Sequence, residues 1–222
     1  MSVLKKIMPE KIPAFGAIFY NLLPARMFTP HYQMIADEVA LRENSVLLDV
    51  GTGPGILPIR IAERFPASKI IGIDLSPEMI RIANRHNLKT GNLRNVEFRV
   101  MDANALEFRD NTLDMVISTG SLHHWKDPVR ILDEIYRCLK PGCVAWIYDG
   151  YGNATDEDIK KCIKKLFFGF PSTGLVKRIL GIHGFSQGEY GTLVKDMVAR
   201  SRFKSCTFEK RAIMMRLSFR KG

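Results

Sequence analysis

From residue 46 onward, short apolar runs alternate with longer segments whose apolar residues recur at helical spacing. This alternation is typical of crossover units, which build a parallel sheet with helices on both faces. The apolar runs predict five strands, at 46–50, 69–75, 96–101, 114–118 and 143–148. The helical segments predict helices at 56–65 and 77–88, and a third that Asp127-Pro128 opens and Pro141-Gly142 closes.

The C-terminal third predicts two helices, at 155–168 and 186–200, and two strands, at 203–209 and 212–219. Only a few residues separate these strands, so no crossover helix fits between them and they must form an antiparallel hairpin. The sequence therefore predicts an α/β fold, a seven-stranded sheet with a reversed last strand and helices on both faces.

Length and composition indicate one domain, because 222 residues with 46% hydrophobic and 25% charged side chains can bury a single core. No apolar run approaches the ~18 residues of a membrane-spanning helix, and prolines interrupt the N-terminus where a signal peptide would be apolar. We therefore expect a cytoplasmic protein. The four cysteines form no CxxC pair and have no histidine at zinc spacing, so we expect no metal.

The net charge of +10 is unevenly distributed. Residues 1–150 hold 18 Lys and Arg against 17 Asp and Glu, whereas residues 151–222 hold 15 against 6. Within the basic part, residues 156–180 place Ile159, Ile163 and Phe167 on one helical face and lysines on the rest. This pattern fits a cap helix packed on the sheet, or a peripheral contact with an anionic membrane or another polyanion.

Acidic residues mark the ends of the predicted strands, where open parallel sheets bind their ligands. Asp49 precedes the loop Gly51-Thr52-Gly53-Pro54-Gly55, whose glycines allow a tight turn and a close approach to a ligand. Asp74 lies 23 residues after Gly51, where its carboxylate can accept both hydroxyls of a ribose. This spacing predicts an adenosine cofactor.

The loop is poorly suited to the pyrophosphate of NAD. Its glycine spacing is GxGxG instead of GxGxxG, and Pro54 removes a backbone amide. Asp49 would repel a pyrophosphate, but it would attract an ammonium or sulfonium group.

Four segments, DVGTGPG, IIGIDLSPEMI, VMDANALEF and LDMVISTGSLHHWKDP, follow one another in order between residues 45 and 150. They resemble the successive motifs of class I S-adenosylmethionine-dependent methyltransferases. The subgroup that they resemble most is the small-molecule type that includes ubiquinone/menaquinone C-methyltransferases. The resemblance implies a Rossmann-like fold, S-adenosylmethionine as cofactor, and in-line methyl transfer to a small-molecule acceptor of lipophilic or anionic character.

Position by position, the resemblance also implies a set of cofactor-binding residues. Asp49 and the three loop glycines would hold the methionine part, and Asp74 would bind the ribose hydroxyls. The adenine would contact Leu75, Met79, Asp102 and Ala103. The methionine end of the cofactor would contact Ser118 and Thr119.

The acceptor side is predicted from His123 and from an aromatic N-terminal segment. His123 follows the fourth strand and is a candidate general base, with packing as the alternative. In the family that the chain resembles, a segment such as 12–32 folds over the cofactor, so Tyr20 and Tyr32 are candidate walls of the acceptor pocket, with completion of the core as the alternative. The implied organisation is a helical lid at 1–44, a cofactor-binding core at 45–150, and a basic helical cap with a terminal hairpin at 151–222.

Three other functions remain open at this point. An RNA methyltransferase would use the basic C-terminal third, although STGSLHHW stands where enzymes that methylate base amines have [DNS]PP[YFW]. The chain could instead be a non-catalytic S-adenosylmethionine-binding partner protein, or an NAD-linked reductase. No DNA partner is predicted, and the pattern leaves the acceptor atom and the oligomeric state open.

Overall fold

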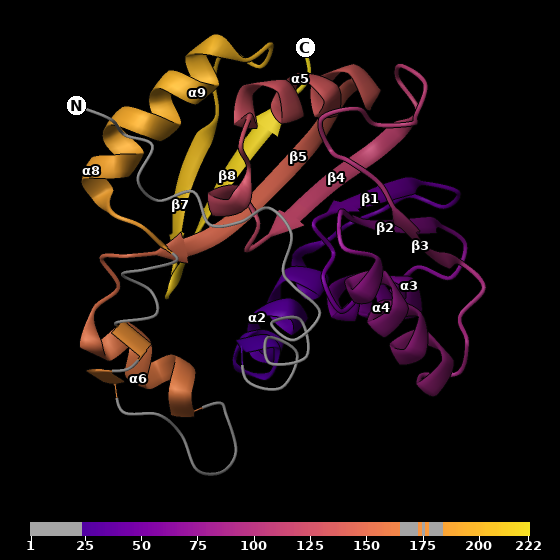
Figure 1. Ribbon diagram of the computed structural model, residues 1–222, viewed down its shortest axis with the longest axis horizontal. Coiled ribbons are helices and arrows are strands. Elements are labelled where there is room, and N and C mark those ends of the chain that lie inside the picture. The colour runs from indigo at the N-terminus through magenta and orange to yellow at the C-terminus, as the bar shows by residue number, and fades with distance from the viewer. Residues whose placement is uncertain (1–23, 165–172, 175, 178–183) are drawn as a thin grey trace.

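The computed structural model describes residues 24–164, 173–174, 176–177 and 184–222, and a mixed sheet forms its centre (Figure 1). The strands run in the order β3-β2-β1-β4-β5-β8-β7, and β6 pairs with the end of β5. The first five strands are parallel to one another, and β8 is antiparallel to both of its neighbours. The strand bounds are β1 Val46–Val50, β2 Lys69–Asp74, β3 Val96–Val100, β4 Leu113–Thr119, β5 Leu139–Tyr151, β6 Gly184–Phe185, β7 Thr207–Arg211 and β8 Met214–Arg220. The predicted Rossmann-like sheet with a reversed last strand is confirmed, and the two-residue β6 is an addition to it.

Helices cover both faces of the sheet, as predicted (Figure 1). Side chains of α2, α3 and α4 join the core on one face, and side chains of α5 and α9 join the core on the other. The helical bounds are α2 Pro24–Glu38, α3 Ile56–Arg64, α4 Pro77–Lys89, η2 Leu122–His124, α5 Pro128–Cys138, α6 Asp156–Lys164, α8 Gln187–Glu189, η3 Tyr190–Val194 and α9 Lys195–Arg200.

Capping side chains fix where the helices begin. Ser76 accepts a hydrogen bond from the amide of Met79, and a proline occupies the first turn of α4. Before α8, the amide of Ser186 donates to the Glu189 carboxylate, and the amide of Glu189 donates to the Ser186 hydroxyl. Ser186 and Glu189 thus form a capping box at the start of the helix predicted at 186–200.

Strand β5 corrects two boundaries of the sequence prediction. Helix α5 ends at Cys138 rather than at Pro141-Gly142, because the fully buried Leu139 already pairs with Leu113 of β4. The residues between Leu139 and Val144 form an irregularity in the register, in which Gly142 has a φ of +77°. The strand also continues to Tyr151, beyond its predicted end at residue 148, so Asp149 lies within β5.

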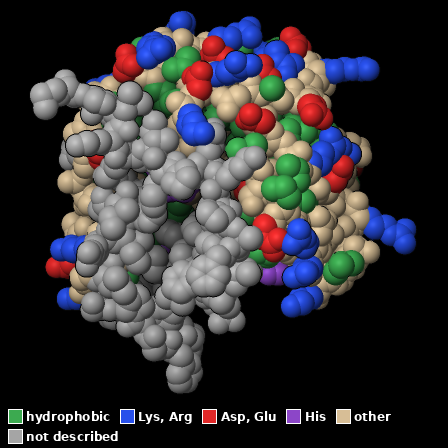
Figure 2. Space-filling model, viewed as in Figure 1, with side chains coloured by type: hydrophobic (Ala, Val, Ile, Leu, Met, Phe, Trp, Pro, Cys, Tyr) green, Lys and Arg blue, Asp and Glu red, His purple; other side chains and the backbone are tan. Residues whose placement is uncertain are grey.

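Among the described residues on the face seen in Figure 2, basic side chains lie between acidic ones and do not form a patch of one sign. Several basic residues of the C-terminal third pair with acids: Lys177 with Asp156, and Lys210 with Asp158. Helix α6 has its predicted start, and Ile159 is buried. Most other side chains of the segment 156–180, and with them the predicted amphipathic face, lie outside the part of the chain that the structure describes. Within the described residues, no helix is long and apolar enough to cross a membrane, and no group of three or more His, Cys, Asp or Glu could hold a metal.

Candidate cofactor and acceptor site

A pocket opens at the carboxyl ends of β1, β2 and β4, beside the central strand of the sheet. The chain crosses from β1 to β2 on one side and places β4 on the other, so this is the point at which strand order reverses. Ten of the predicted residues line the pocket: Tyr32, Asp49, Gly51, Gly53, Asp74, Leu75, Met79, Asp102, Ala103 and Thr119. Their convergence supports the prediction of one ligand site at this edge.

The glycine loop bends closely around its neighbours. Gly51 has a φ of +71°, and a Cβ at this position would lie 2.6 Å from the Cβ of Ser121. Gly55 also has a positive φ, but it does not line the pocket. A Cβ there would lie 2.7 Å from Ala83 of α4, so its lack of a side chain permits close packing of the loop against α4.

Asp74 connects the loop to the start of α4. One carboxylate oxygen accepts a hydrogen bond from the Gly53 amide, and the other accepts from the Ser76 amide, each at 2.9 Å. Burial raises the pKa of this carboxyl, and the two amides oppose the rise. Because each carboxylate oxygen has two acceptor positions, both oxygens can still accept a ligand hydroxyl.

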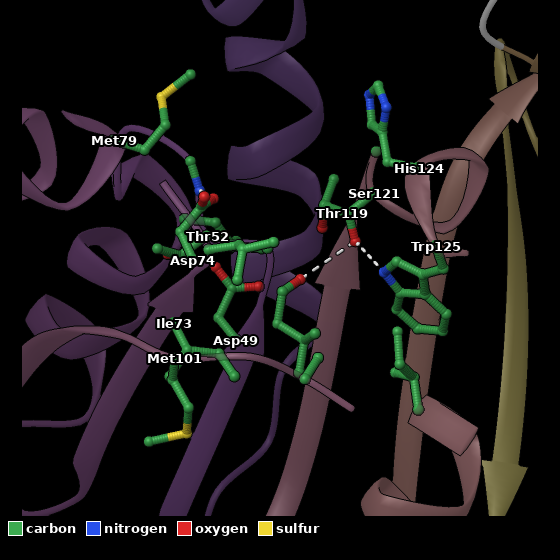
Figure 3. Close-up of a pocket in the computed structure, with 18 of the residues that line it drawn as sticks. Asp49, Thr52, Ile73, Asp74, Met79, Met101, Thr119, Ser121, His124 and Trp125 are labelled. Atoms are coloured by element: carbon green, nitrogen blue, oxygen red, sulfur yellow. Dashed lines mark hydrogen bonds between the residues drawn. The ribbon is translucent and has the colours of Figure 1, made fainter. Parts of the chain in front are cut away.

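Asp49 is the most enclosed acid of the pocket, with 2% of its surface exposed. Its Oδ1 atom is buried without a hydrogen-bond partner in the described part of the chain. Burial raises the pKa of Asp49 to about 7; the Thr52 hydroxyl opposes the rise, and the charge of Asp74 adds to it. Figure 3 shows both acids on one side of the pocket, across from Ser121 and Trp125.

The other predicted adenine contacts lie around the ends of β2 and β3. Met79 is buried on α4 and lines the pocket with Leu75, Ile73 and Met101. Asp102 is exposed, and one of its oxygens accepts hydrogen bonds from the backbone and side-chain nitrogens of Asn104. An apolar slot with an acceptor at its rim fits a purine ring that carries an amino group.

The loop after β4 forms the opposite wall. Thr119 lines the pocket, whereas the fully buried Ser118 does not: its hydroxyl donates to the Val50 carbonyl and lies 2.6 Å from the Ser121 hydroxyl. Ser121 in turn accepts from the indole nitrogen of Trp125 (Figure 3). Ser118 thus holds the end of β1 against the loop.

The two adjacent histidines have different positions. His123 does not line the pocket, because its backbone amide and its Nδ1 atom both contact the buried carboxylate of Asp149, at 3.0 Å and 2.9 Å. His124 does line the pocket, and its ring centroid lies 4.0 Å from that of His123. Tyr32 lines the pocket from α2, whereas Tyr20 lies outside the described residues.

Sequence reasoning did not assign Thr52, Ser121, His124 or Trp125 to the ligand site, although all four line the pocket. Thr52 is a member of the glycine loop, and the other three belong to the segment after β4. Their position within these two loops was therefore the signal from which the sequence could have predicted them as pocket residues.

The fold and the site together define a nucleoside-cofactor-binding protein of the Rossmann-like class. Asp74 offers acceptors for ribose hydroxyls, and the acidic side chain of Asp49, with its Oδ1 atom unpartnered among the described residues, favours a cationic group over a pyrophosphate. S-Adenosylmethionine carries both features, so the residues present fit it.

Comparisons with known proteins agree with this class. Residues 48–147 match the model of a methyltransferase domain. The chain is 26% identical over 187 residues to a ubiquinone/menaquinone biosynthesis C-methyltransferase of Hydrogenovibrio crunogenus, covering 73% of this chain and 74% of that enzyme. It is 36% identical over 113 residues to phosphoethanolamine N-methyltransferase 3 of Arabidopsis thaliana, covering 51% of this chain but only 22% of the relative.

A solved structure shares the whole fold. It is that of a putative S-adenosyl-L-methionine-dependent methyltransferase from Methanococcus maripaludis, with a TM-score of 0.75 and 23% identity, covering 100% of this chain and 97% of that one. Residues 48–147 thus form a methyltransferase domain, and the fold and the pocket fit S-adenosylmethionine-dependent methyl transfer with S-adenosylmethionine as the cofactor.

Proposed function

We propose that the protein methylates a small, lipophilic aromatic acceptor of the phenol or hydroquinone type. The observation that carries this proposal is the composition of the pocket beyond the cofactor-binding acids: Tyr32, Leu57, Trp125 and Ile131 line it, and no Lys or Arg does so among the described residues. An apolar wall without a cation favours an uncharged ring over an anionic acceptor. The name of the Hydrogenovibrio relative points to the same class of acceptor.

We assign the cofactor contacts to the residues that converge in the pocket. Asp49 and the loop of Gly51 and Gly53 would hold the methionine part, and Asp74 would bind the ribose. Met79 and Asp102 would enclose and orient the adenine. S-Adenosylmethionine supplies a methyl group already activated on a sulfonium sulfur, so the remaining task of the protein is to align the acceptor and exclude water.

A phenolic acceptor must also lose a proton when it gains the methyl group. We place the proton-accepting role at His124, because it lines the pocket. His123 would then be a positioning residue for the adjacent His124. Asp149 holds His123 in place, since the Nδ1 atom and the backbone amide of His123 both contact that carboxylate. This arrangement transfers the base role predicted for His123 to its neighbour.

The test is methyl transfer from labelled S-adenosylmethionine to 1,4-naphthohydroquinone, with phosphoethanolamine as the polar comparison. We expect label in the naphthohydroquinone and none in phosphoethanolamine. We also expect His124→Gln to lower kcat by about 10² or more without changing cofactor affinity. Label in phosphoethanolamine, or none in either acceptor, would contradict the proposed acceptor class.

A further inference from the structure

Asp49 is a buried carboxylate whose charge the fold compensates only in part. It is the fourth residue of the five-residue strand β1, is 2% exposed, and has one oxygen with no hydrogen-bond partner among the described residues. An ionised carboxylate in such a place is costly, because burial keeps water away and the Thr52 hydroxyl offsets only part of that cost. The position therefore favours a neutral, protonated carboxyl until a cation arrives.

The acids around Asp49 do not supply that cation. Asp74 faces it from β2, Asp102 lines the same pocket after β3, and His124 lines it from η2. Tyr32 contributes from α2, and no Lys or Arg lines the pocket in the part of the chain that the structure describes. With burial and Asp74 both favouring the protonated form, the pKa of Asp49 rises to about 7.

We propose that Asp49 is a charge-selective binding residue that holds a proton in the ligand-free protein and releases it to solvent when a cationic ligand binds. Binding then exchanges one positive charge for another at the bottom of the pocket, so the total charge there is conserved. A neutral nucleoside would leave the proton in place and gain nothing from the carboxylate. The residue thus selects for the charged cofactor, and this inference does not depend on which acceptor is methylated.

The pH dependence of binding follows directly. Below pH 7 the proton must be expelled, so affinity for a cationic ligand should rise by about tenfold per pH unit and level off above pH 7. Affinity for a neutral nucleoside should be flat over the same range, because that ligand expels no proton.

Titration calorimetry between pH 5.5 and 7.5, in buffers of different ionisation enthalpy, measures the protons released. The probes are S-adenosylmethionine and 5′-methylthioadenosine, a neutral nucleoside without the amino-acid part. The range stays below pH 8 because α-amino groups titrate near that value. We expect close to one proton per S-adenosylmethionine at pH 5.5, fewer at pH 7.5, and none with 5′-methylthioadenosine.

Asp49→Asn keeps the shape of the side chain and removes the titration. We expect this variant to bind S-adenosylmethionine without proton release, with pH-independent affinity that is about tenfold or more weaker at pH 7.5, and to bind 5′-methylthioadenosine as the wild type does. The control His124→Gln should retain the wild-type proton release. Equal weakening of both ligands in Asp49→Asn, or no proton release by the wild type, would overturn the inference. Normal proton release without acceptor methylation would contradict only the proposed function.

Discussion

At the scale of single residues, spacing predicted that the acids lie at the pocket, but it did not predict their hydrogen bonds. Asp74 could be placed there from its distance to the glycine loop, because strand length and helix length fix that spacing. Its hydrogen bonds to Gly53 and Ser76 could not, because they depend on the conformation of the loop. For the same reason the sequence could not tell which of His123 and His124 faces the pocket, because the two are neighbours in one short 3-10 helix and its orientation decides where each side chain points.

The proposed ribose contact of Asp74, together with its two amide contacts, predicts a graded response to substitution. Asp74→Ala should weaken S-adenosylmethionine binding by about 1.5–3 kcal/mol, because it removes the ribose acceptor and leaves two amides unpaired. Asp74→Asn should lose less, since its oxygen still accepts from one amide. Titration calorimetry measures both, with Asp110→Ala as the control because that carboxylate is 67% exposed and outside the pocket. Unchanged affinity in Asp74→Ala would remove Asp74 from the site.

At the scale of elements, apolar periodicity located every major strand, and it failed where long-range pairing sets the boundary. The start of β5 at Leu139 depends on its partner Leu113, and the two-residue β6 exists only because it pairs with the end of β5. Charged contacts between distant elements were equally invisible. Glu38 of α2 forms ion pairs with Arg211 and Arg216 of the terminal hairpin.

This cluster should contribute measurably to the joining of α2 and the hairpin. Arg216 is 11% exposed and pairs with Glu38 at 2.7 Å and Glu209 at 2.6 Å. Arg216→Met should therefore lower the free energy of unfolding by about 1–3 kcal/mol, because it removes the less exposed of the two arginines that Glu38 and Glu209 share and leaves only Arg211 between them. Arg200→Met is the matched control, because Arg200 pairs with Asp196 at 3.4 Å and both side chains are exposed, at 67% and 66%. Its free energy of unfolding, measured in urea like that of Arg216→Met, should change by less than about 0.5 kcal/mol. Equal effects would show that the partly buried cluster contributes no more than a surface ion pair.

At the scale of the whole molecule, strand order determines where chemistry can occur. The sheet places β1 between β2 and β4, so the loops that follow these three strands meet at one edge, although they are far apart in the sequence. Alternating strands and helices predict this convergence, whereas the wall formed by α2 and Tyr32 depends on how the N-terminal part packs. The net charge of +10 is a less direct guide, because several C-terminal basic residues are paired with acids of the same chain.

A crystal structure of the protein with S-adenosylhomocysteine tests the central claim most directly. We predict the nucleoside at the carboxyl ends of β1, β2 and β4, with its ribose hydroxyls on Asp74 and its amino-acid part over the loop that begins at Gly51. A nucleoside bound elsewhere, or a ribose that does not contact Asp74, would contradict the assignment of this pocket.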